Sequence, residues 1–368
     1  MRMDKTIAVL EGDGIGPEIV REALKVLKAI ETKYGHRFTL NHAPFGAAAY
    51  FTEGSPFPEG TKAICDEADV IIKGPVGLAV EKMNEIPPEH RPEIGAILPL
   101  RRRYDTFANY RPVRLPKGLA SFSPLKPELI GEGIDILMIR ELVGGIYFGD
   151  KLEGPQTGMR YAKDDCTYTD DQVRRVAIVA FEEARKKACP LTNIHKANVL
   201  ATSRFWNQVV DDVAKSYPEV PYRSLLVDNA AYQLVKYPRG LNGVVLLENM
   251  QGDILTDEAG GIIGSLGLMP SACVGPEKSY VEPAHGSAPD IAGKNIANPY
   301  SMIGSIALML ERCLGLPDEA RDVWEALFHV FSQGYTTVEL AEGESETRKV
   351  LTTSEFGDAV VGNISRKA

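Results

Sequence analysis

The sequence predicts an α/β fold, because short apolar runs typical of strands alternate along the chain with longer amphipathic stretches typical of helices. Strands are expected at residues 6–10, 68–77, 134–141, 224–231 and 243–249. Helical periodicity covers residues 17–34, 170–187, 199–216, 301–314 and 317–333. The chain has 368 residues, which is enough for two domains or one large lobed domain.

The first expected strand runs into the motif GDGIGPE at residues 12–18. Pro17 and Glu18 suit the first turn of a helix, because proline lacks a donor that would be unpaired there and a carboxylate complements the helix dipole. The glycine spacing differs from the dinucleotide fingerprint G-x-G-x-x-G. Two interpretations stay open: a turn that lets strand and helix pack closely, or backbone amides that approach a ligand.

Composition excludes several classes of function. Hydrophobic residues make up 44% and charged residues 25%, which is ordinary for a folded soluble protein. The net charge of −9 argues against a surface for nucleic acid or an anionic membrane. The five cysteines contain no C-x-x-C pair, so we expect buried, reduced thiols and no zinc site. Without a targeting or membrane-spanning segment, the expected location is cytoplasmic.

The stretch at residues 144–169 differs from its surroundings, because it is rich in glycine and aromatic residues and has no helical period. This composition predicts a protruding hairpin or arm, a feature that often serves a subunit interface. It ends at Thr169-Asp170-Asp171, which is typical of the start of a helix.

Three arginines stand beside apolar strand-like segments. Arg101 and Arg111 occur in residues 92–114, and Arg140 follows shortly after. The guanidinium fork matches a carboxylate bidentately, so three of them in an acidic protein suggest a substrate with more than one carboxylate. Each arginine taken singly could equally be a solvated surface residue.

Three aspartates form a second group: Asp228, Asp253 and Asp257. The last two are four residues apart, which places both carboxylates on one face of a helix. Carboxylates that converge in this way suit Mg²⁺ or Mn²⁺. The alternative for any one aspartate is helix capping.

Two further segments carry candidate residues. Lys196 and Asn198 stand just before an amphipathic helix, and a lysine desolvated beside a metal would act as a base, although an exposed lysine is the simpler interpretation. The loop at 281–299 contains glycines that leave backbone accessible, and its Asp290 offers an acceptor for ribose hydroxyls. A loop of this length and composition predicts a binding function.

Taken in order, the motifs resemble those of the β-decarboxylating dehydrogenases, the group that contains the isocitrate, homoisocitrate, tartrate/D-malate and 3-isopropylmalate dehydrogenases. The shared motifs are GDGIGPE, LPLRRR, ANYRPVR, RELVGGIYFG, HKANVL, VDNAA, GDILTDEA, GSLGLMPSA and EPAHGSAPDIAGKNIANP. The resemblance implies the isopropylmalate dehydrogenase-like two-lobed fold with a large mixed sheet flanked by helices, not a Rossmann fold. It further implies a discontinuous nucleotide-binding lobe at 1–105 and 264–368, and a second lobe at 106–263 with the metal ligands, dimer interface and arm.

The resemblance also implies site residues. Substrate contacts would be Glu93, Ile97, Leu98, Arg101, Arg111, Arg140 and Asp228. Metal ligands would be Asp228, Asp253 and Asp257. Cofactor contacts would be Ile15, Asn198, His285, Gly286, Ser287, Ala288, Pro289, Asp290, Ile291, Ala292, Gly293, Lys294 and Asn298.

The implied reaction is NAD-dependent oxidation of a 2-hydroxy acid, followed by loss of the β-carboxylate assisted by Mg²⁺ or Mn²⁺ and protonation of the enol. Lys196 would be the base and Tyr147 the acid. In the family the lysine and the first aspartate come from the neighbouring subunit, so a homodimer with shared active sites is expected. The adenosine half of NAD would lie in loop 285–298, and the glycine turn would border the nicotinamide and substrate.

The residues that would meet the variable group of the substrate are Ile97 and Leu98. Two aliphatic side chains favour an isopropyl group, at about 0.8 kcal/mol per buried CH₂, and cannot compensate a third carboxylate. We therefore expect conversion of 3-isopropylmalate to 2-oxo-4-methylpentanoate in leucine biosynthesis. The alternatives are a tartrate/D-malate or homoisocitrate dehydrogenase, or a non-catalytic regulatory subunit, although such a subunit should have lost some of the catalytic residues present here.

Overall fold

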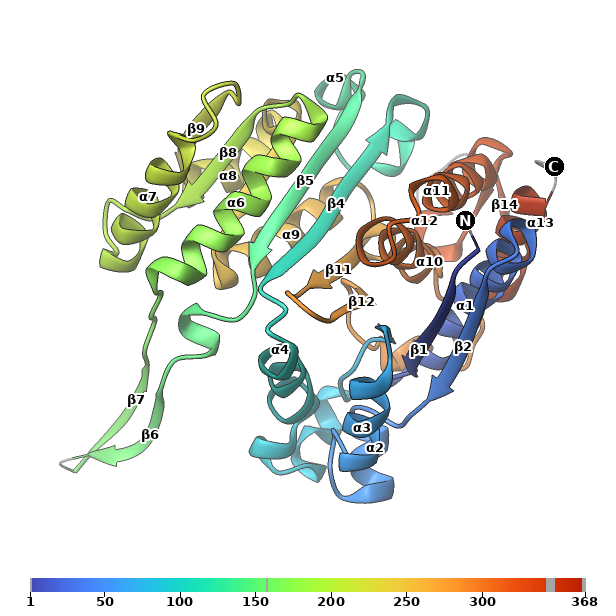
Figure 1. Cartoon of the computed structure of the whole chain (residues 1–368), viewed down its shortest axis with the longest axis horizontal. Coiled ribbons are helices and arrows are strands. Elements are labelled where there is room, and N and C mark those ends of the chain that lie inside the picture. Colours follow the sequence, from blue (N-terminus) through green and yellow to red (C-terminus); the bar gives the residue numbers. More distant parts are fainter. Residues whose placement is uncertain (1, 157, 342–347, 366–368) are drawn as a thin grey trace.

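The structure, a computed structural model, describes residues 2–156, 158–341 and 348–365. In this part of the chain, ten strands form one mixed sheet in the order β2-β1-β3-β12-β11-β4-β5-β10-β8-β9 (Figure 1). Their bounds are β1 (Asp4–Leu10), β2 (Arg37–His42), β3 (Val70–Lys73), β4 (Ala108–Pro116), β5 (Gly133–Glu141), β8 (Leu191–His195), β9 (Tyr222–Leu226), β10 (Gly243–Leu247), β11 (Pro270–Val274) and β12 (Ser279–Pro283). Strand β11 is antiparallel to β12 and β4, and β4 is antiparallel to β5. The predicted α/β class and the large mixed sheet are confirmed.

Helices flank both halves of this sheet. The longer ones are α1 (Gly16–Tyr34), α6 (Asp170–Lys187), α7 (Ala201–Ala214), α8 (Val227–Lys236), α9 (Asn249–Ile262), α10 (Tyr300–Leu308), α11 (Pro317–Ser332) and α13 (Thr353–Ser365). The shorter ones are α2 (Ala47–Glu53), α3 (Glu59–Glu67), α4 (Leu98–Tyr104), α5 (Pro127–Ile130) and α12 (Val338–Ala341). Helices α1, α10, α11 and α13 pack together at one end, while α6 and α9 pack against β5 at the other (Figure 1). No helix among the described residues has both the length and the apolar character needed to cross a membrane.

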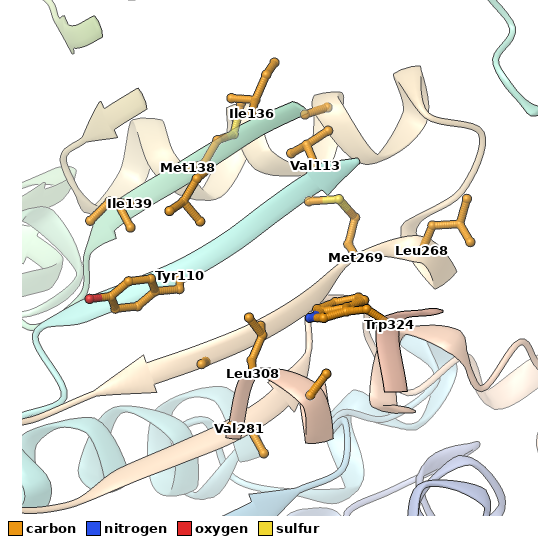
Figure 2. Packing of buried hydrophobic residues seen from close by; sticks show 14 of the residues in the cluster. Tyr110, Val113, Ile136, Met138, Ile139, Leu268, Met269, Val281, Leu308 and Trp324 are labelled. Carbon is orange, nitrogen blue, oxygen red and sulfur yellow. The ribbon is translucent and has the colours of Figure 1, made fainter. Parts of the chain in front are cut away.

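The main apolar core joins the two halves of the sheet. Figure 2 shows Tyr110 of β4 and Met138 of β5 on one side, with Met269, Leu308 and Trp324 on the other. All of these side chains are buried. This packing holds β4 and β5 against β11 and β12. Several of the polar residues described below lie on β4, β5 and β12.

One predicted strand is wrong in its second half. The segment expected as a strand over 224–231 leaves the sheet at Leu226, and α8 begins at Val227. Ala230 and Leu234 are four residues apart and both buried, which is the spacing of a helix with one buried face. Asp228 lies in the first turn of α8, where its carboxylate complements the helix dipole.

Other boundaries differ by a few residues. The strand expected over 243–249 ends at Leu247, because Glu248 caps α9 by accepting hydrogen bonds from the amides of Met250 and Gln251. The strand expected over 68–77 is ordered as a strand only at Val70–Lys73. The helix expected over 301–314 continues after α10 as a π-helical segment, Met309–Cys313.

The arm is a two-stranded hairpin that projects from the body (Figure 1). Its strands are β6 (Lys151–Gln156) and β7 (Met159–Asp164), and β7 is exposed along its length. A second small sheet pairs β13 (Tyr335–Thr336) with β14 (Lys349–Val350). The helix start after the arm is confirmed, since Thr169 and Gln172 form a reciprocal capping box. The five cysteines are free, but only Cys65 and Cys273 are buried, whereas the other three are partly exposed.

Candidate active site

A cavity of about 590 Å³ opens where β12 and its following loop face β4, β5 and α9. Side chains of both polar and apolar character line it. The lining residues are Lys73, Pro75, Val76, Glu93, Ile94, Ile97, Leu98, Arg101, Arg111, Arg140, Tyr147, Lys151, Asp253, Asp257, Glu282, Pro283, Ala284, His285 and Gly286. All three predicted substrate arginines and two of the three predicted metal ligands therefore meet in one place.

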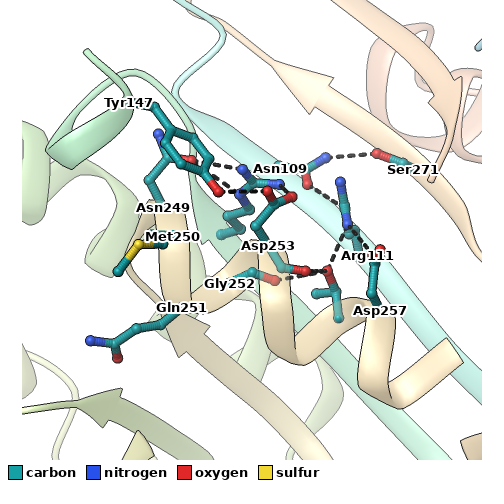
Figure 3. A network of polar contacts seen from close by, with 12 residues as sticks. Asn109, Arg111, Tyr147, Asn249, Met250, Gln251, Gly252, Asp253, Asp257 and Ser271 are labelled. Atoms are coloured by element: carbon teal, nitrogen blue, oxygen red, sulfur yellow. Dashed lines mark hydrogen bonds and ion pairs between the residues drawn. The ribbon is translucent and has the colours of Figure 1, made fainter. Parts of the chain in front are cut away.

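Arg111 lies in the middle of β4 and is buried. Its Nε donates to Asn109 Oδ1 at 2.8 Å, and a terminal nitrogen donates to Thr256 Oγ1 at 2.6 Å (Figure 3). The same nitrogen lies 3.4 Å from a carboxylate oxygen of Asp257. The guanidinium is thus fixed from two sides, with its remaining donors available to the cavity.

Arg140 lies at the end of β5 and is also buried. Its Nε and one terminal nitrogen donate to Asn249 Oδ1, at 3.2 and 2.8 Å, and the other terminal nitrogen pairs with Asp253 (Figure 3). Burial lowers the pKa of Arg140 to about 10, with Asp253 opposing that shift. The guanidinium therefore remains charged at neutral pH.

Arg101 is held differently. It lies on α4, and its Nε donates to the hydroxyl of Tyr280 at 3.2 Å. One terminal nitrogen lies 3.8 Å from Glu282, which is within ion-pair range but too long for a hydrogen bond. This single hydrogen bond contrasts with the several that fix Arg111 and Arg140.

Asp253 and Asp257 lie on one face of α9, as their spacing predicts. Burial favours the protonated form of Asp253, but Arg140 and Arg111 outweigh it and hold the pKa of that carboxyl below its usual value. Burial raises the pKa of Asp257, although Arg111 opposes the shift. Both carboxylates offer oxygen donors of the kind that a hard divalent cation takes.

Tyr147 lies in a short 3₁₀ turn, Gly145–Tyr147, between β5 and the arm. Its hydroxyl donates to Asp253 Oδ2 at 2.8 Å (Figure 3). Burial and this carboxylate raise the pKa of Tyr147 to about 12. The phenol is therefore protonated at neutral pH and has a proton to give.

Lys196 and Asp228 lie apart from the cavity lining. They pair with each other, with Lys196 Nζ 2.6 Å from Asp228 Oδ1, and the hydrogen bond from Lys196 lowers the pKa of Asp228. Asn198 is exposed nearby in sequence. Across the described residues, no group of three or more histidine, cysteine or acidic side chains is close enough to hold a metal ion. One chain therefore does not assemble all three predicted metal ligands.

The apolar part of the cavity comes from the segment before α4. Ile97 and Leu98 line it as predicted, together with Ile94, which the sequence analysis did not single out. The segment Glu93–Ile97 is a π-helical turn that continues directly into α4. The predicted Glu93 lines the same wall.

The glycine turn packs against the loops beside the cavity. A Cβ at Gly12 would lie 2.1 Å from the carbonyl oxygen of Pro75, and one at Gly14 would lie 2.0 Å from that of Ser287. Both glycines have positive φ, 75° and 56°. The amide of Ile15 donates to Ser287 O at 2.8 Å. Glycine is therefore required at these two positions, because the backbones of neighbouring loops approach the turn closely.

The predicted cofactor residues in loop 285–298 fall into three groups. His285 and Gly286 line the cavity, while Ser287 and Asn298 are buried and do not line it. The other predicted residues of the loop do not line the cavity and are exposed or partly exposed; they are Ala288, Pro289, Asp290, Ile291, Ala292, Gly293 and Lys294.

Sequence reasoning missed several buried polar residues that support the site. Asn109 lies two residues from Arg111, on the same face of β4, and strand alternation could have indicated it. Lys73 ends an otherwise apolar strand and pairs with Glu282 at 2.6 Å. Burial opposes ionisation of Glu282, but Lys73 and Arg101 outweigh it and lower its pKa to about 2. A charged residue inside an apolar run is the signal that could have found Lys73.

The fold is of the α/β class and its cavity combines arginines, carboxylates and an aliphatic wall; comparisons with known proteins give the family. The isocitrate/isopropylmalate dehydrogenase family matches residues 6–360. The chain belongs to this family. A 3-isopropylmalate dehydrogenase from Thermotoga maritima is 46% identical over 356 residues, covering 96% of this chain and 97% of the relative. A 3-isopropylmalate dehydrogenase from Syntrophotalea carbinolica is 46% identical, covering 99% of each chain.

Solved structures agree with the fold. The crystal structure of isocitrate dehydrogenase from Methylococcus capsulatus has a TM-score of 0.86 at 30% identity, covering 98% of this chain and 99% of that chain. A β-decarboxylating dehydrogenase from Thermococcus kodakarensis has a TM-score of 0.77 at 31% identity, covering 98% and 96%.

Proposed function

We propose that the chain catalyses NAD-dependent oxidative decarboxylation of 3-isopropylmalate to 2-oxo-4-methylpentanoate, a reaction of leucine biosynthesis. The observation that carries the proposal is a single cavity that combines three arginines with an aliphatic wall. The 3-isopropylmalate dehydrogenases that match the chain over nearly its whole length support the same substrate.

The two substrate carboxylates would bind Arg101, Arg111 and Arg140. Because Arg111 and Arg140 are anchored by asparagines, binding a carboxylate would not require reorienting them. The isopropyl group would contact Ile97 and Leu98, whose burial by substrate excludes water from that wall.

A divalent cation, Mg²⁺ or Mn²⁺, would be held by Asp253 and Asp257. The two carboxylates fit such an ion, because they supply oxygen donors from one face of a helix. Their ion pairs are with Arg111 and Arg140, two arginines that the substrate carboxylates would also contact. When bound, the cation would stabilise negative charge that develops on substrate oxygen during decarboxylation.

The remaining site residues, Lys196, Asn198 and Asp228, would come from a second copy of the chain, so the active unit would be a homodimer. The segments around them carry exposed apolar side chains, Val199 near Lys196 and Tyr232 one turn after Asp228. Exposed apolar side chains of this kind are suited to burial in an interface. The exposed arm would add to the same interface.

Two side chains would move protons. Lys196 would take the proton of the substrate hydroxyl as NAD accepts the hydride. Tyr147, whose hydroxyl proton points to Asp253, would then protonate the decarboxylated carbon. The adenosine part of NAD would lie along loop 285–298, with Asp290 accepting from the ribose hydroxyls.

Metal dependence tests this function. Asp253→Asn should lower metal-dependent NADH formation by about 100-fold or more, because losing even a group that only orients a metal ligand costs about 10- to 100-fold. The fold should persist, because Asp253 is partly exposed and lies at the cavity rather than in the apolar core, but the free energy of unfolding should fall because buried Arg140 loses its ionic partner. Glu258→Gln, on the same helix but outside the cavity lining, is the matched control. Full activity of Asp253→Asn, or of the wild type after chelation, would contradict the proposal.

A further inference from the structure

We propose that Tyr280 is a positioning residue that sets the orientation of Arg101 and thereby the affinity for the substrate. This inference rests on the proposed function, because it assigns Arg101 to a substrate carboxylate. It concerns a buried phenol that does not itself line the cavity.

The three arginines differ in how they are held. Arg111 has hydrogen bonds to Asn109 and Thr256, and Arg140 has two to Asn249 in addition to its pairing with Asp253. Among the described residues, the one side-chain hydrogen bond of Arg101 runs from Nε to the Tyr280 hydroxyl. Loss of that acceptor would free Arg101, whereas no single loss would free the other two.

The strand pattern explains why the phenol reaches Arg101. Tyr280 and Glu282 are two residues apart on β12, so both side chains leave the same face of the sheet. The Tyr280 hydroxyl donates to Glu282 Oε1 at 3.4 Å while it accepts from Arg101 at 3.2 Å. Lys73, at the end of the neighbouring β3, pairs with the other carboxylate oxygen of Glu282. A chain of buried polar contacts thus links Lys73 to Arg101.

Glu282 alone does not replace the phenol. Its nearest approach to Arg101 is 3.8 Å, which leaves the guanidinium attracted but not oriented. Burial raises the pKa of Tyr280 well above its usual range, so the hydroxyl stays protonated at neutral pH. It can therefore donate to Glu282 and accept from Arg101 at the same time. Orientation matters because a bidentate contact with carboxylate requires the guanidinium plane to face it.

The test is Tyr280→Phe, which keeps the ring and removes only the hydroxyl. We expect KM for 3-isopropylmalate to rise by about ten-fold or more, as for the loss of a hydrogen bond to a charged group. KM for NAD should stay unchanged, because the hydrogen bonds of the Tyr280 hydroxyl go to Arg101 and Glu282 and not to the cofactor loop. Tyr34→Phe is the control: it removes a phenol that also bonds a side chain, Asp322, at the distant contact of α1 with α11.

A double-mutant cycle separates positioning from loss of structure. In an Arg101→Lys background, Tyr280→Phe should change KM for the substrate little further, because lysine has no Nε donor to orient. An unchanged substrate KM in Tyr280→Phe, equal changes in both KM values, or additive effects in the cycle would overturn the role of Tyr280 while leaving the proposed function intact. Failure of the wild type to turn over any substituted malate would overturn both.

Discussion

At the scale of single residues, the site depends on side chains that are buried only because each charge has a partner. Arg140 and Lys73 are almost fully buried, and each pairs with a carboxylate, Asp253 or Glu282. Such pairs give little net stability, but removing one partner leaves an uncompensated buried charge. They fix the charges of the cavity before a ligand arrives, which favours binding of a polyanion.

The Lys73–Glu282 pair predicts a specific pH dependence of stability. The pKa of Glu282 is about 2 in the folded chain, below the ordinary value of 4.5. Its ionised form therefore contributes stability that is fully present above about pH 4.5 and is lost as the pH falls toward 2. Glu282→Gln should lower the free energy of unfolding by about 3–5 kcal/mol at neutral pH, since Lys73 loses its partner.

The measurement is the difference in Tm between wild type and Glu282→Gln as a function of pH. This difference should be constant from pH 7 to about 4.5 and narrow below that, because Glu282 then begins to protonate in the unfolded wild-type chain while it is still ionised in the folded one. If the difference in Tm between wild type and Glu282→Gln had already disappeared between pH 7 and 5, Glu282 would not be held ionised by its neighbours.

Cofactor choice also belongs to single residues. An ionised Asp290 can accept from both ribose hydroxyls of NAD, but it would meet the 2′-phosphate of NADP with like charge and no donor. We therefore expect a strong preference for NAD, and Asp290→Lys with Ile291→Tyr should shift the ratio of kcat/KM values toward NADP by at least about ten-fold.

Asp290→Asn is the intermediate control for that experiment, because it keeps an acceptor oxygen and removes the charge. It should relax the preference without reversing it. Equal use of both cofactors by the wild type, or an unmoved ratio in the double variant, would place the adenosine ribose elsewhere.

At the scale of elements, the sequence predicted the long helices better than the strands that carry the site. The bounds of β4 and β12 were not predicted, because their apolar alternation is interrupted by buried polar residues such as Asn109, Arg111 and Glu282. The same polar residues form the site, so residues needed for function disrupt the apolar alternation by which a strand is recognised in sequence. The π-helical turn Glu93–Ile97 was also missed, since a single wide turn leaves little trace in periodicity.

The contacts of the predicted site residues were a second feature that the sequence did not predict. Motif order located the arginines and aspartates, whereas the contacts from Asn249 and Tyr280 depend on strand register and long-range packing. These pairings join residues up to 179 positions apart in sequence. Local pattern carries no information about them.

The start of α6 gives a test at this scale. Thr169 accepts from the amide of Gln172 at 3.3 Å, and its own amide donates to the Gln172 side chain at 3.0 Å. Thr169→Ala should cost about 1 kcal/mol of stability and lower Tm by a few degrees. Thr52→Ala removes an exposed threonine within α2 that bonds only carbonyls, and should change Tm less. Equal losses in both variants would contradict a specific capping role.

At the scale of the whole molecule, the strand order supports the proposed lobes. Strands β2, β1, β3, β12 and β11 come from residues 1–105 and 264–368, and β4, β5, β10, β8 and β9 come from residues 106–263. The cavity lies where the two sets meet, with Glu282 contributed by one and Arg111 by the other. We propose that ligands bind between the lobes and contact both.

The central claim is that this cavity binds 3-isopropylmalate, and NADH formation across a panel of acids tests it most directly. The panel is 3-isopropylmalate, D-malate, tartrate, isocitrate and homoisocitrate, each with Mg²⁺ or Mn²⁺. We predict the highest kcat/KM for 3-isopropylmalate, exceeding D-malate by at least the order of ten-fold, because the aliphatic wall buries the three carbons of the isopropyl group. A higher kcat/KM for isocitrate or homoisocitrate, or no NADH with 3-isopropylmalate, would contradict the account.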